Sequence, residues 1–503
     1  MKNKINIVFV AGFLLMVTTI AGASLFPSRG IADIPVVPIR PLPSPEPTVA
    51  QDEVTIAQSG QFAIDRQVIA GGGGTSTAGT LRLDGTVAEV PASNNLSGGT
   101  FTLAGGYWNT LASNGPTPTT SIQFTAANFD VLESGLTSNI TVMRTGDTTG
   151  TSTVQYSTSD VAGAQLCSVA NGAASSRCDY ITALGTLTFG PNETSKSITV
   201  LIVDDVYPEG AETLTINLSN PTGAGLGIPS SSTLTIADND VTLGVNPIDQ
   251  AGFFVREHYF DFLNRVPDAP GLNFWTNEIA QCGATTTCIE VKRINVSAAF
   301  FLSIEFQETG YLVYRLYKAS FGNIAGEPVP VTLNNFLRDT QEIGRNVVVG
   351  APGWETLLEN NKQAFVLAYV QRPEFTLAFS TSLTADQLVA QLDTNAGGVL
   401  SAAEKSSLVT ILGSAPSDPS KRAQVLRAVA EDVDLRNAEF NKAFVLMQYF
   451  GYLRRNPNDF PDANFDGYNF WLGKLNQFNG NFVQAEMVRA FLVSDEYRHR
   501  FGP

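Results

Sequence analysis

Apolar and polar residues alternate with a period of two in five short runs between residues 121 and 241. The runs are Ile140–Met143, Thr153–Tyr156, Ile198–Val203, Thr213–Leu218 and Thr233–Ile236. Successive side chains of a strand point to opposite faces, so each run can bury one face and expose the other. Turn residues separate the runs, and no amphipathic helical pattern interrupts them. The pattern predicts an Ig-like antiparallel β-sandwich over residues 121–241.

Beyond residue 250 the apolar residues recur with a helical period, and the sequence repeats itself. The matched segments are Phe254-Val255 with Phe444-Val445, Tyr259-Phe260 with Tyr449-Phe450, Gly271–Trp275 with Gly467–Trp471, and Phe301–Phe306 with Phe491–Tyr497. A degenerate middle copy spans Tyr314–Phe375. Internal repetition predicts a mostly α-helical repeat domain over residues 250–503. Repeated helical units form binding scaffolds more often than reaction centres.

The N-terminus has the three-part pattern of a secretory signal peptide. Lys2 and Lys4 precede the apolar run Ile5–Ala21, and Ala21–Ala23 offers small residues for cleavage. We therefore expect residues 1–23 to be removed on export, which makes the mature protein secreted or exposed at the cell surface. The alternative is an uncleaved N-terminal anchor, because the run is near the length that spans a bilayer. No later segment is apolar for long enough to span, so polytopic membrane insertion is excluded.

Composition divides the residues between this signal and the sandwich. Residues 24–53 include seven prolines from Pro27 to Pro47 and predict a Pro-rich, extended linker. Residues 54–110 are rich in Gly, Thr and Ser with short alternating runs, and they predict a small Gly-rich β module. Residues 111–120 form a second linker.

Charge limits the classes of partner. The chain has 31 basic and 47 acidic residues, which gives a net charge of −16. An acidic chain repels nucleic acid, so no nucleic-acid partner is expected. Two histidines, His258 and His499, leave little material for a zinc site or for histidine-based catalysis.

The four cysteines form two local pairs, Cys167 with Cys178 and Cys282 with Cys288. An even number of cysteines in an exported protein indicates disulfides rather than metal-binding or catalytic thiols. Each predicted disulfide would close one short loop.

Carboxylates gather at or near the ends of the predicted strands: Glu133, Asp179, Asp204, Asp205, Glu209, Asp238 and Asp240. Asp204 and Asp205 would point to opposite faces within a strand, so both can reach one ion only where the strand ends and the chain turns. Tyr207-Pro208 supplies such a turn. If these segments meet at one rim, their repulsion requires a cation. Calcium, which takes roughly six to eight oxygen ligands, suits this set better than zinc or iron.

At these residues the chain resembles the Calx-beta domain, the calcium-binding module of sodium–calcium exchangers and of many bacterial surface proteins. The resemblance covers Ser121–Val241. Its motifs are Phe129–Glu133, Asp179-Tyr180, Gly185–Glu193, Asp204–Glu212 and Asp238–Asp240. The resemblance implies calcium ligation by the side chains of Glu133, Asp179, Asp204, Asp205, Glu209, Asp238, Asn239 and Asp240, and by the main-chain carbonyl of Tyr207.

Several positions depart from the family pattern. Val206 stands where exchanger domains often have a third Asp, Asn239 replaces a middle acid, and Gly210 and Ala211 replace further acids. Fewer charges predict weaker binding or fewer ions. The loop that Cys167 and Cys178 would close is an insertion before Asp179 that can displace this ligand. The alternative to a calcium site is a set of solvated acidic turns on a sandwich that binds no ion.

A second, weaker calcium pattern spans residues 393–404 in the helical half. Its EF-hand-like ligands are Asp393, Asn395, the carbonyl of Val399, Ser401 and Glu404. Position five is Gly397, which has no side-chain oxygen, so a degenerate loop retained only as a turn is an equal alternative. The segment Asp462–Gly467 begins in the same way, but we expect a turn that caps a helix.

The helical half resembles a bacterial domain of unknown function that is found repeatedly in exported calcium-binding and surface-layer-like proteins. The resemblance implies no reaction. We therefore expect a secreted or cell-surface, calcium-binding, non-enzymatic protein for adhesion, cell communication or a surface structure, with a protein or cell-surface glycan as partner. The alternative is an exported glycan-acting hydrolase that uses the recurring carboxylates Glu305, Glu374 and Glu496.

Overall fold

The computed structural model describes residues 73–78, 81–86, 96–98, 101–103, 120–163 and 165–503. The predicted signal peptide and the Pro-rich linker lie outside these ranges, as does the second linker apart from Thr120, which begins a strand. The chain divides into two units, Met1–Thr117 and Pro118–Pro503.

In the first unit, two antiparallel strand pairs fall within the described ranges. β1 (Gly73–Ala78) pairs with β2 (Leu81–Thr86), and β3 (Leu96–Gly98) pairs with β4 (Phe101–Leu103). The Gly-rich β module expected over residues 54–110 stays a prediction beyond these four strands.

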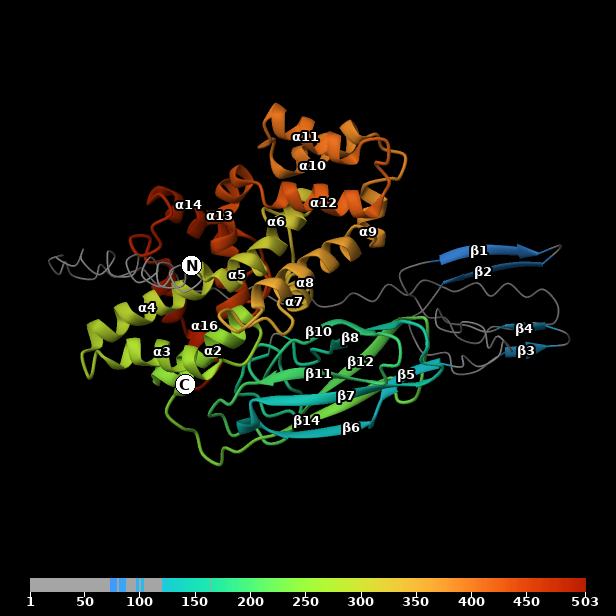
Figure 1. The fold of residues 1–503 in the computed structure, drawn as a ribbon. Coiled ribbons are helices and arrows are strands. Elements are labelled where there is room, and N and C mark those ends of the chain that lie inside the picture. Colours follow the sequence, from blue (N-terminus) through green and yellow to red (C-terminus); the bar gives the residue numbers. More distant parts are fainter. Residues whose placement is uncertain (1–72, 79–80, 87–95, 99–100, 104–119, 164) are drawn as a thin grey trace, which may run out of the picture. The chain divides into compact units, whose positions relative to one another are not determined.

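The second unit begins with a sandwich of two five-stranded sheets (Figure 1). The first sheet has the order β10 (Leu184–Phe189), β8 (Ser152–Thr158), β12 (Glu212–Thr222), β14 (Ser231–Ala237) and β6 (Asn128–Leu132). The second has the order β13 (Gly225–Leu226), β5 (Thr120–Phe124), β7 (Thr137–Gly146), β11 (Ser195–Ile202) and β9 (Tyr180–Ile181). The predicted β-sandwich is confirmed. Its strands are not all antiparallel, because β14 and β6, and also β13 and β5, run parallel.

Alternation of apolar residues forms the core of the sandwich. In β7, Ile140 and Val142 are fully buried, and their neighbours on either side lie on the opposite, more exposed face. In β12, Leu214 and Ile216 continue the same inward phase. These side chains interdigitate between the two sheets and exclude water from the space between them.

Helices follow the sandwich from residue 251 onward, after the short 3-10 turn η2 (Pro247–Asp249). They are α2 (Ala251–Leu263), α3 (Ala269–Ala280), α4 (Thr286–Leu302), α5 (Ile304–Glu308), α6 (Gly310–Phe321), α7 (Leu333–Ile343), α8 (Trp354–Tyr369), α9 (Pro373–Ala378), α10 (Ala385–Ala396), α11 (Ala402–Leu412), α12 (Pro419–Ala430), α13 (Val433–Gln448), the π-helical continuation η3 (Tyr449–Leu453), α14 (Asp466–Gln477), α15 (Met487–Leu492) and α16 (Asp495–Arg498). Among the helices of the described ranges, none has both the length and the apolar character needed to cross a membrane.

The two segments that match in sequence also end their first helices alike. Asn264 ends α2 and Arg454 ends η3, each with φ 52° and ψ 38°, and their N–H groups donate to the carbonyls of Tyr259 and Tyr449 respectively. A left-handed residue at this position satisfies a terminal helix carbonyl and turns the chain. The assignment of this region to a repeated bacterial domain family stays a prediction.

Both predicted disulfides are present. Cys167 is bonded to Cys178 in the loop before β9, and Cys282 is bonded to Cys288 between α3 and α4. Each closes a short loop, as the local pairing predicted.

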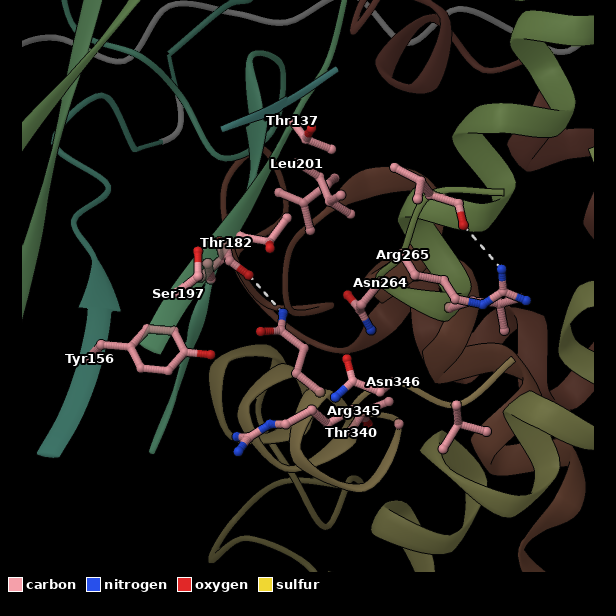
Figure 2. Close-up of a pocket in the computed structure, with 18 of the residues that line it drawn as sticks. Thr137, Tyr156, Thr182, Ser197, Leu201, Asn264, Arg265, Thr340, Arg345 and Asn346 are labelled. Carbon is pink, nitrogen blue, oxygen red and sulfur yellow. Dashed lines mark hydrogen bonds between the residues drawn. The ribbon is translucent and has the colours of Figure 1, made fainter. Parts of the chain in front are cut away.

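The helical region contacts the sandwich over a mixed apolar and polar surface. α7 lies against β10, and Ile181 and Leu201 of the sandwich join the apolar core of the helices. The Gln341 amide donates to the carbonyl of Thr182 at 2.8 Å, one of the dashed lines in Figure 2. A cavity of about 530 Å³ lies beside this contact. Hydroxyl, amide, guanidinium and amine groups line it together with apolar side chains, but no carboxylate belongs to its lining, so it lacks the ligands of a calcium site.

Candidate metal centre

The register of the first sheet brings three acidic segments to one end of the sandwich. β6 and β14 run parallel with Val131 opposite Ile236, so Glu133 and Asp238 follow at the same edge. β12 runs antiparallel to β14 and begins at Glu212, also opposite Ile236. The end of β6, the end of β14 and the start of β12 therefore meet.

The second sheet brings the remaining acidic segments to the same end. β11 ends at Ile202, opposite Tyr180 at the start of β9. The N–H of Val203 donates to the carbonyl of Asp179 at 2.9 Å, so this acid lies beside the turn that contains Asp204 and Asp205. We call the set Glu133, Asp179, Asp204, Asp205, Glu209, Glu212, Asp238 and Asp240 the acidic rim.

Within the acidic rim, Glu133, Asp238 and Asp240 form a first acidic group. One carboxylate oxygen from each lies within 4.8 Å of the other two. Asp238 is oriented by backbone donors: its Oδ2 accepts from the N–H groups of Glu209 and Gly210, both at 2.8 Å. Its Oδ1 accepts from the N–H of Asp240 at 2.6 Å. The loop after β14 and the turn after β11 are therefore held together through one carboxylate.

Asp179, Glu209 and Glu212 form a second acidic group with the same mutual spacing of 4.8 Å. Asp179 and Glu212 are buried, and Glu209 is half-buried. Asp179 accepts a hydrogen bond from the N–H of Ser175 through Oδ2. The insertion closed by the first disulfide thus leaves Asp179 within the rim and does not displace it.

Asp205 is 4% exposed and links the turn after β11 to Glu133. Its N–H donates to Glu133 Oε1 at 2.9 Å, and its Oδ1 accepts from the N–H of Tyr207 at 2.7 Å. Its second oxygen, Oδ2, is buried without a hydrogen-bond donor. A carboxylate fixed through one oxygen, with the other free of protein donors, is available to a cation.

Two further buried oxygens of the described rim also lack a donor, Glu212 Oε1 and Asp240 Oδ2. Buried polar atoms are almost always hydrogen-bonded, because desolvation without a partner costs about 1–3 kcal/mol. Three such oxygens at one end of one domain, all from carboxylates, fit a hard cation with oxygen ligands. Neither acidic group contains histidine or cysteine, so the donor set does not match zinc.

The electrostatics of the rim point the same way. Burial raises the pKa of Glu133 to about 8, with Asp204, Asp238 and Asp240 adding to the effect and the hydrogen bond from Asp205 opposing it. Burial and the nearby Asp179 raise the pKa of Glu209 to about 8. Burial and Glu212 raise the pKa of Asp179 well above its usual range. Without a cation, the rim can keep its carboxylates close together only by holding protons at neutral pH.

Comparison with known proteins now decides the class of this domain. A family model for the Calx-beta domain matches residues 116–240. This part of the chain is a Calx-beta domain.

Similar curated proteins are sodium/calcium exchangers. The Calx-beta domain is 33% identical over 142 residues to sodium/calcium exchanger 1 of Felis catus and, equally, to that of Bos taurus. Each match covers 24% of this chain and 14% of the exchanger. The likeness is thus confined to one domain and spans a small part of the relatives' own length.

Among solved structures, the apo form of the Calx CBD1 domain is 28% identical with a TM-score of 0.22, and the match covers 24% of this chain and 98% of that one. The calcium binding domain CBD12 of CALX1.1 is 27% identical with a TM-score of 0.21, covering 25% of this chain and 50% of that one.

The Calx-beta domain brings together the acidic residues that the sequence pattern singled out. Asn239 lies at the edge of the rim, where its Oδ1 accepts from the N–H of Ser134 at 3.1 Å and ties the loop after β14 to the short turn η1 (Glu133–Gly135). The N–H of Tyr207, whose carbonyl was the expected main-chain ligand, orients Asp205.

Glu212 is the rim residue that the sequence analysis did not select as a ligand. It is 4% exposed and starts β12 in the same inward phase as Leu214 and Ile216. A carboxylate in the phase of core residues is the signal that identifies it, because a buried acid needs a partner.

The EF-hand-like segment in the helical half is built as a helix–turn–helix junction. Asp393 lies in the last turn of α10, where its carboxylate accepts from the N–H of Leu400 and from Lys405 Nζ, both at 3.0 Å. Ser401 and Glu404 form a capping box at the start of α11. Asn395 Nδ2 donates to the carbonyl of Ser320 at 2.6 Å. Of the two interpretations, these contacts favour the retained turn, and Val399 is one residue of that turn.

The carboxylates considered for hydrolysis are engaged or exposed. Arg265 forks onto Glu305 at 2.6 and 2.8 Å, and Arg455 forks onto Glu496 at 2.5 and 3.0 Å. Glu374 is exposed in the first turn of α9. The two matched forks favour a structural role for Glu305 and Glu496.

Proposed function

We propose that this chain is an exported, non-enzymatic calcium-binding protein of the cell surface. The acidic rim of its Calx-beta domain binds calcium, and its helical region is a scaffold that binds a protein or a cell-surface glycan. The observation that carries the proposal is the set of three buried carboxylate oxygens without donors: Asp205 Oδ2, Glu212 Oε1 and Asp240 Oδ2.

Each residue class of the rim has a distinct part in this function. The first and second acidic groups supply side-chain oxygens, and Asp205 lies between them through its hydrogen bond to Glu133 and its electrostatic coupling to Glu209. Backbone donors to Asp238 and Asp205 orient these carboxylates in advance. Bound calcium would supply the positive charge that compensates the rim. With two acidic groups present, we expect at least two ions.

Two features support export and a binding role. Both disulfides suit an oxidising compartment, and the N-terminal sequence has the pattern of a signal peptide. In the helical region, the recurring carboxylates Glu305 and Glu496 are held by arginines rather than directed into a cleft. A scaffold of packed helices fits these contacts.

Isothermal titration calorimetry of the exported chain with calcium chloride tests the proposal. We expect saturable calcium binding in the presence of magnesium, because the larger calcium ion accepts more carboxylate oxygens than magnesium. Asp205→Asn keeps the shape of the side chain but removes one charge, and it should weaken binding by at least about tenfold.

The matched control is Asp130→Asn, which alters an exposed acid of β6 in the same domain but outside both acidic groups. It should bind like the unaltered chain. An unaltered chain that takes up no calcium at millimolar concentration, or an Asp205→Asn variant that binds as tightly as Asp130→Asn, would contradict the proposal.

A further inference from the structure

The segment Arg500–Gly502, more than 250 residues from the sandwich in sequence, lies against both ligand-bearing loops of the acidic rim. Arg500 Nε donates to the carbonyl of Arg177 at 2.7 Å, two residues before Asp179. Gly502 approaches Val206, the residue after Asp205, so closely that an added Cβ would lie 2.7 Å from Val206 Cγ2. One short segment therefore contacts the loop of the second acidic group and the turn between the two groups.

Arg500 anchors this contact in the helical core. It is 2% exposed, and its guanidinium forks onto Asp261 of α2 at 2.8 and 3.0 Å. It also donates to the carbonyl of Tyr452 at 3.0 Å. Arg177 adds a second link, because its guanidinium donates to the carbonyl of Phe460 at 3.1 Å. The backbone before Asp179 is thus fixed by groups that belong to the helices.

The turn that contains Asp204, Asp205 and Glu209 is held in the same way. Val206 is half-buried between Gly502 and Gly244, and the Gly244 N–H donates to its carbonyl at 3.4 Å. Asn246, buried, donates through Nδ2 to the carbonyls of Gly502 at 2.8 Å and Arg498 at 3.0 Å. Val206 therefore has a use that an acid at this position would not serve: it is the apolar surface on which Gly502 rests.

We propose that Arg500 and Gly502 are positioning residues of the calcium site, which couple the affinity of the acidic rim to the docking of the helical region on the sandwich. The inference rests on the proposed calcium binding and adds the part of the molecule that controls it. Carboxylates at this spacing repel one another, so a turn held from outside spends less of its binding free energy on ordering. Coupling of this kind is reciprocal: calcium also strengthens the docking of the helices.

The test uses a matched pair of glycine variants in the full chain. Gly502→Ala forces Val206 or the backbone of Asn246 to shift, because the new Cβ would lie 2.7 and 3.1 Å from them. Gly473→Ala places the same methyl group in α14, where no atom lies within 4 Å of it. We expect calorimetry to show about tenfold weaker calcium binding for Gly502→Ala, the loss typical when a group that orients ligands is disturbed, and unchanged binding for Gly473→Ala.

A rescue variant separates positioning from general damage. Val206→Ala combined with Gly502→Ala removes the methyl groups that collide and should regain most of the lost affinity. If Gly502→Ala lowers only the melting temperature and keeps the calcium affinity of Gly473→Ala, the inference is overturned while the proposed function stands. If the unaltered chain binds no calcium, the proposed function fails and this inference fails with it.

Discussion

Glu212 shows how a single side chain can reveal a site. It occupies a core-facing position of β12, yet one of its carboxylate oxygens has no donor. Burial raises its pKa to about 7, with Glu209, Glu133 and Asp238 contributing and a hydrogen bond with Asp179 opposing. A buried acid of this kind destabilises the fold unless a proton or a cation accompanies it.

Glu212→Gln tests this balance. The neutral amide removes a buried charge, so the metal-free variant should melt at a higher temperature than the unaltered chain at pH 8. It should gain less from calcium, because a ligand oxygen with full charge has been lost. Differential scanning calorimetry with and without calcium measures both effects, with Asp130→Asn as control. A variant with an unchanged calcium-induced shift would show that Glu212 is not a ligand.

The raised pKa values of Glu133 and Glu209 predict the pH dependence of the metal-free protein. Both lie at about 8 in the folded chain, above the ordinary value of 4.5 that applies when it is unfolded. The folded state therefore binds more protons between these values, and the stability present below pH 4.5 is lost as the pH rises through 8. Urea unfolding of metal-free protein should give a falling free energy of unfolding from pH 5 to pH 8.5.

Saturating calcium should reduce or reverse this fall, because the ion binds the ionised carboxylates and displaces their protons. Calcium affinity should rise over the same pH interval. A free energy of unfolding that stays level from pH 5 to pH 8.5 without metal would contradict the assigned burial of the rim.

At the scale of elements, the helical region uses one device twice. Arg265 with Glu305, and Arg455 with Glu496, each join the turn after a first helix to the start of a short later helix. Glu305→Gln breaks one fork and leaves Arg265 largely buried without its counter-charge. We expect a loss of about 3 kcal/mol in the free energy of unfolding, as for other partly buried pairs that lose one partner.

Glu374→Gln is the matched control, because this third recurring carboxylate is exposed at the start of α9. Chemical unfolding of both variants should show a loss for Glu305→Gln alone, with calcium affinity unchanged in each. Equal stability of the two variants would mean that the fork contributes nothing to the fold.

The junction between α10 and α11 gives a separate prediction. Asp393 is held by Lys405 and by the N–H of Leu400, and both contacts belong to the turn. Asp393→Asn should therefore lower the stability of the helical region without changing the number of bound calcium ions. Native mass spectrometry counts these ions directly. One ion fewer in the variant would restore the EF-hand interpretation.

The sequence predicted the elements better than it predicted their contacts. The period-two runs identified the strands, and the change to a helical period marked the helices, because burial of one face imposes these periods. The two parallel strand pairs were not predicted, since alternation is the same in parallel and antiparallel strands. Glu212 was missed because the family motif named it without assigning it a ligand role.

At the scale of the whole molecule, the structure adds what no local pattern contains. Val206 meets Gly502, and Arg177 meets Arg500, across separations of almost 300 and more than 300 residues. Nothing in the local sequence of either partner specifies these contacts, which depend on how α2, η3 and the sandwich are assembled. They connect the acidic rim to the helices and make the second unit one coupled body in our account.

The central claim is that the acidic rim holds calcium between carboxylates that burial has deprived of other partners. The most direct measurement is a crystal structure of the chain grown with calcium, with an anomalous difference map to locate the ion. The account predicts anomalous density among Glu133, Asp238 and Asp240, and again among Asp179, Glu209 and Glu212. A map with density at neither group, in crystals that contain millimolar calcium, would contradict it.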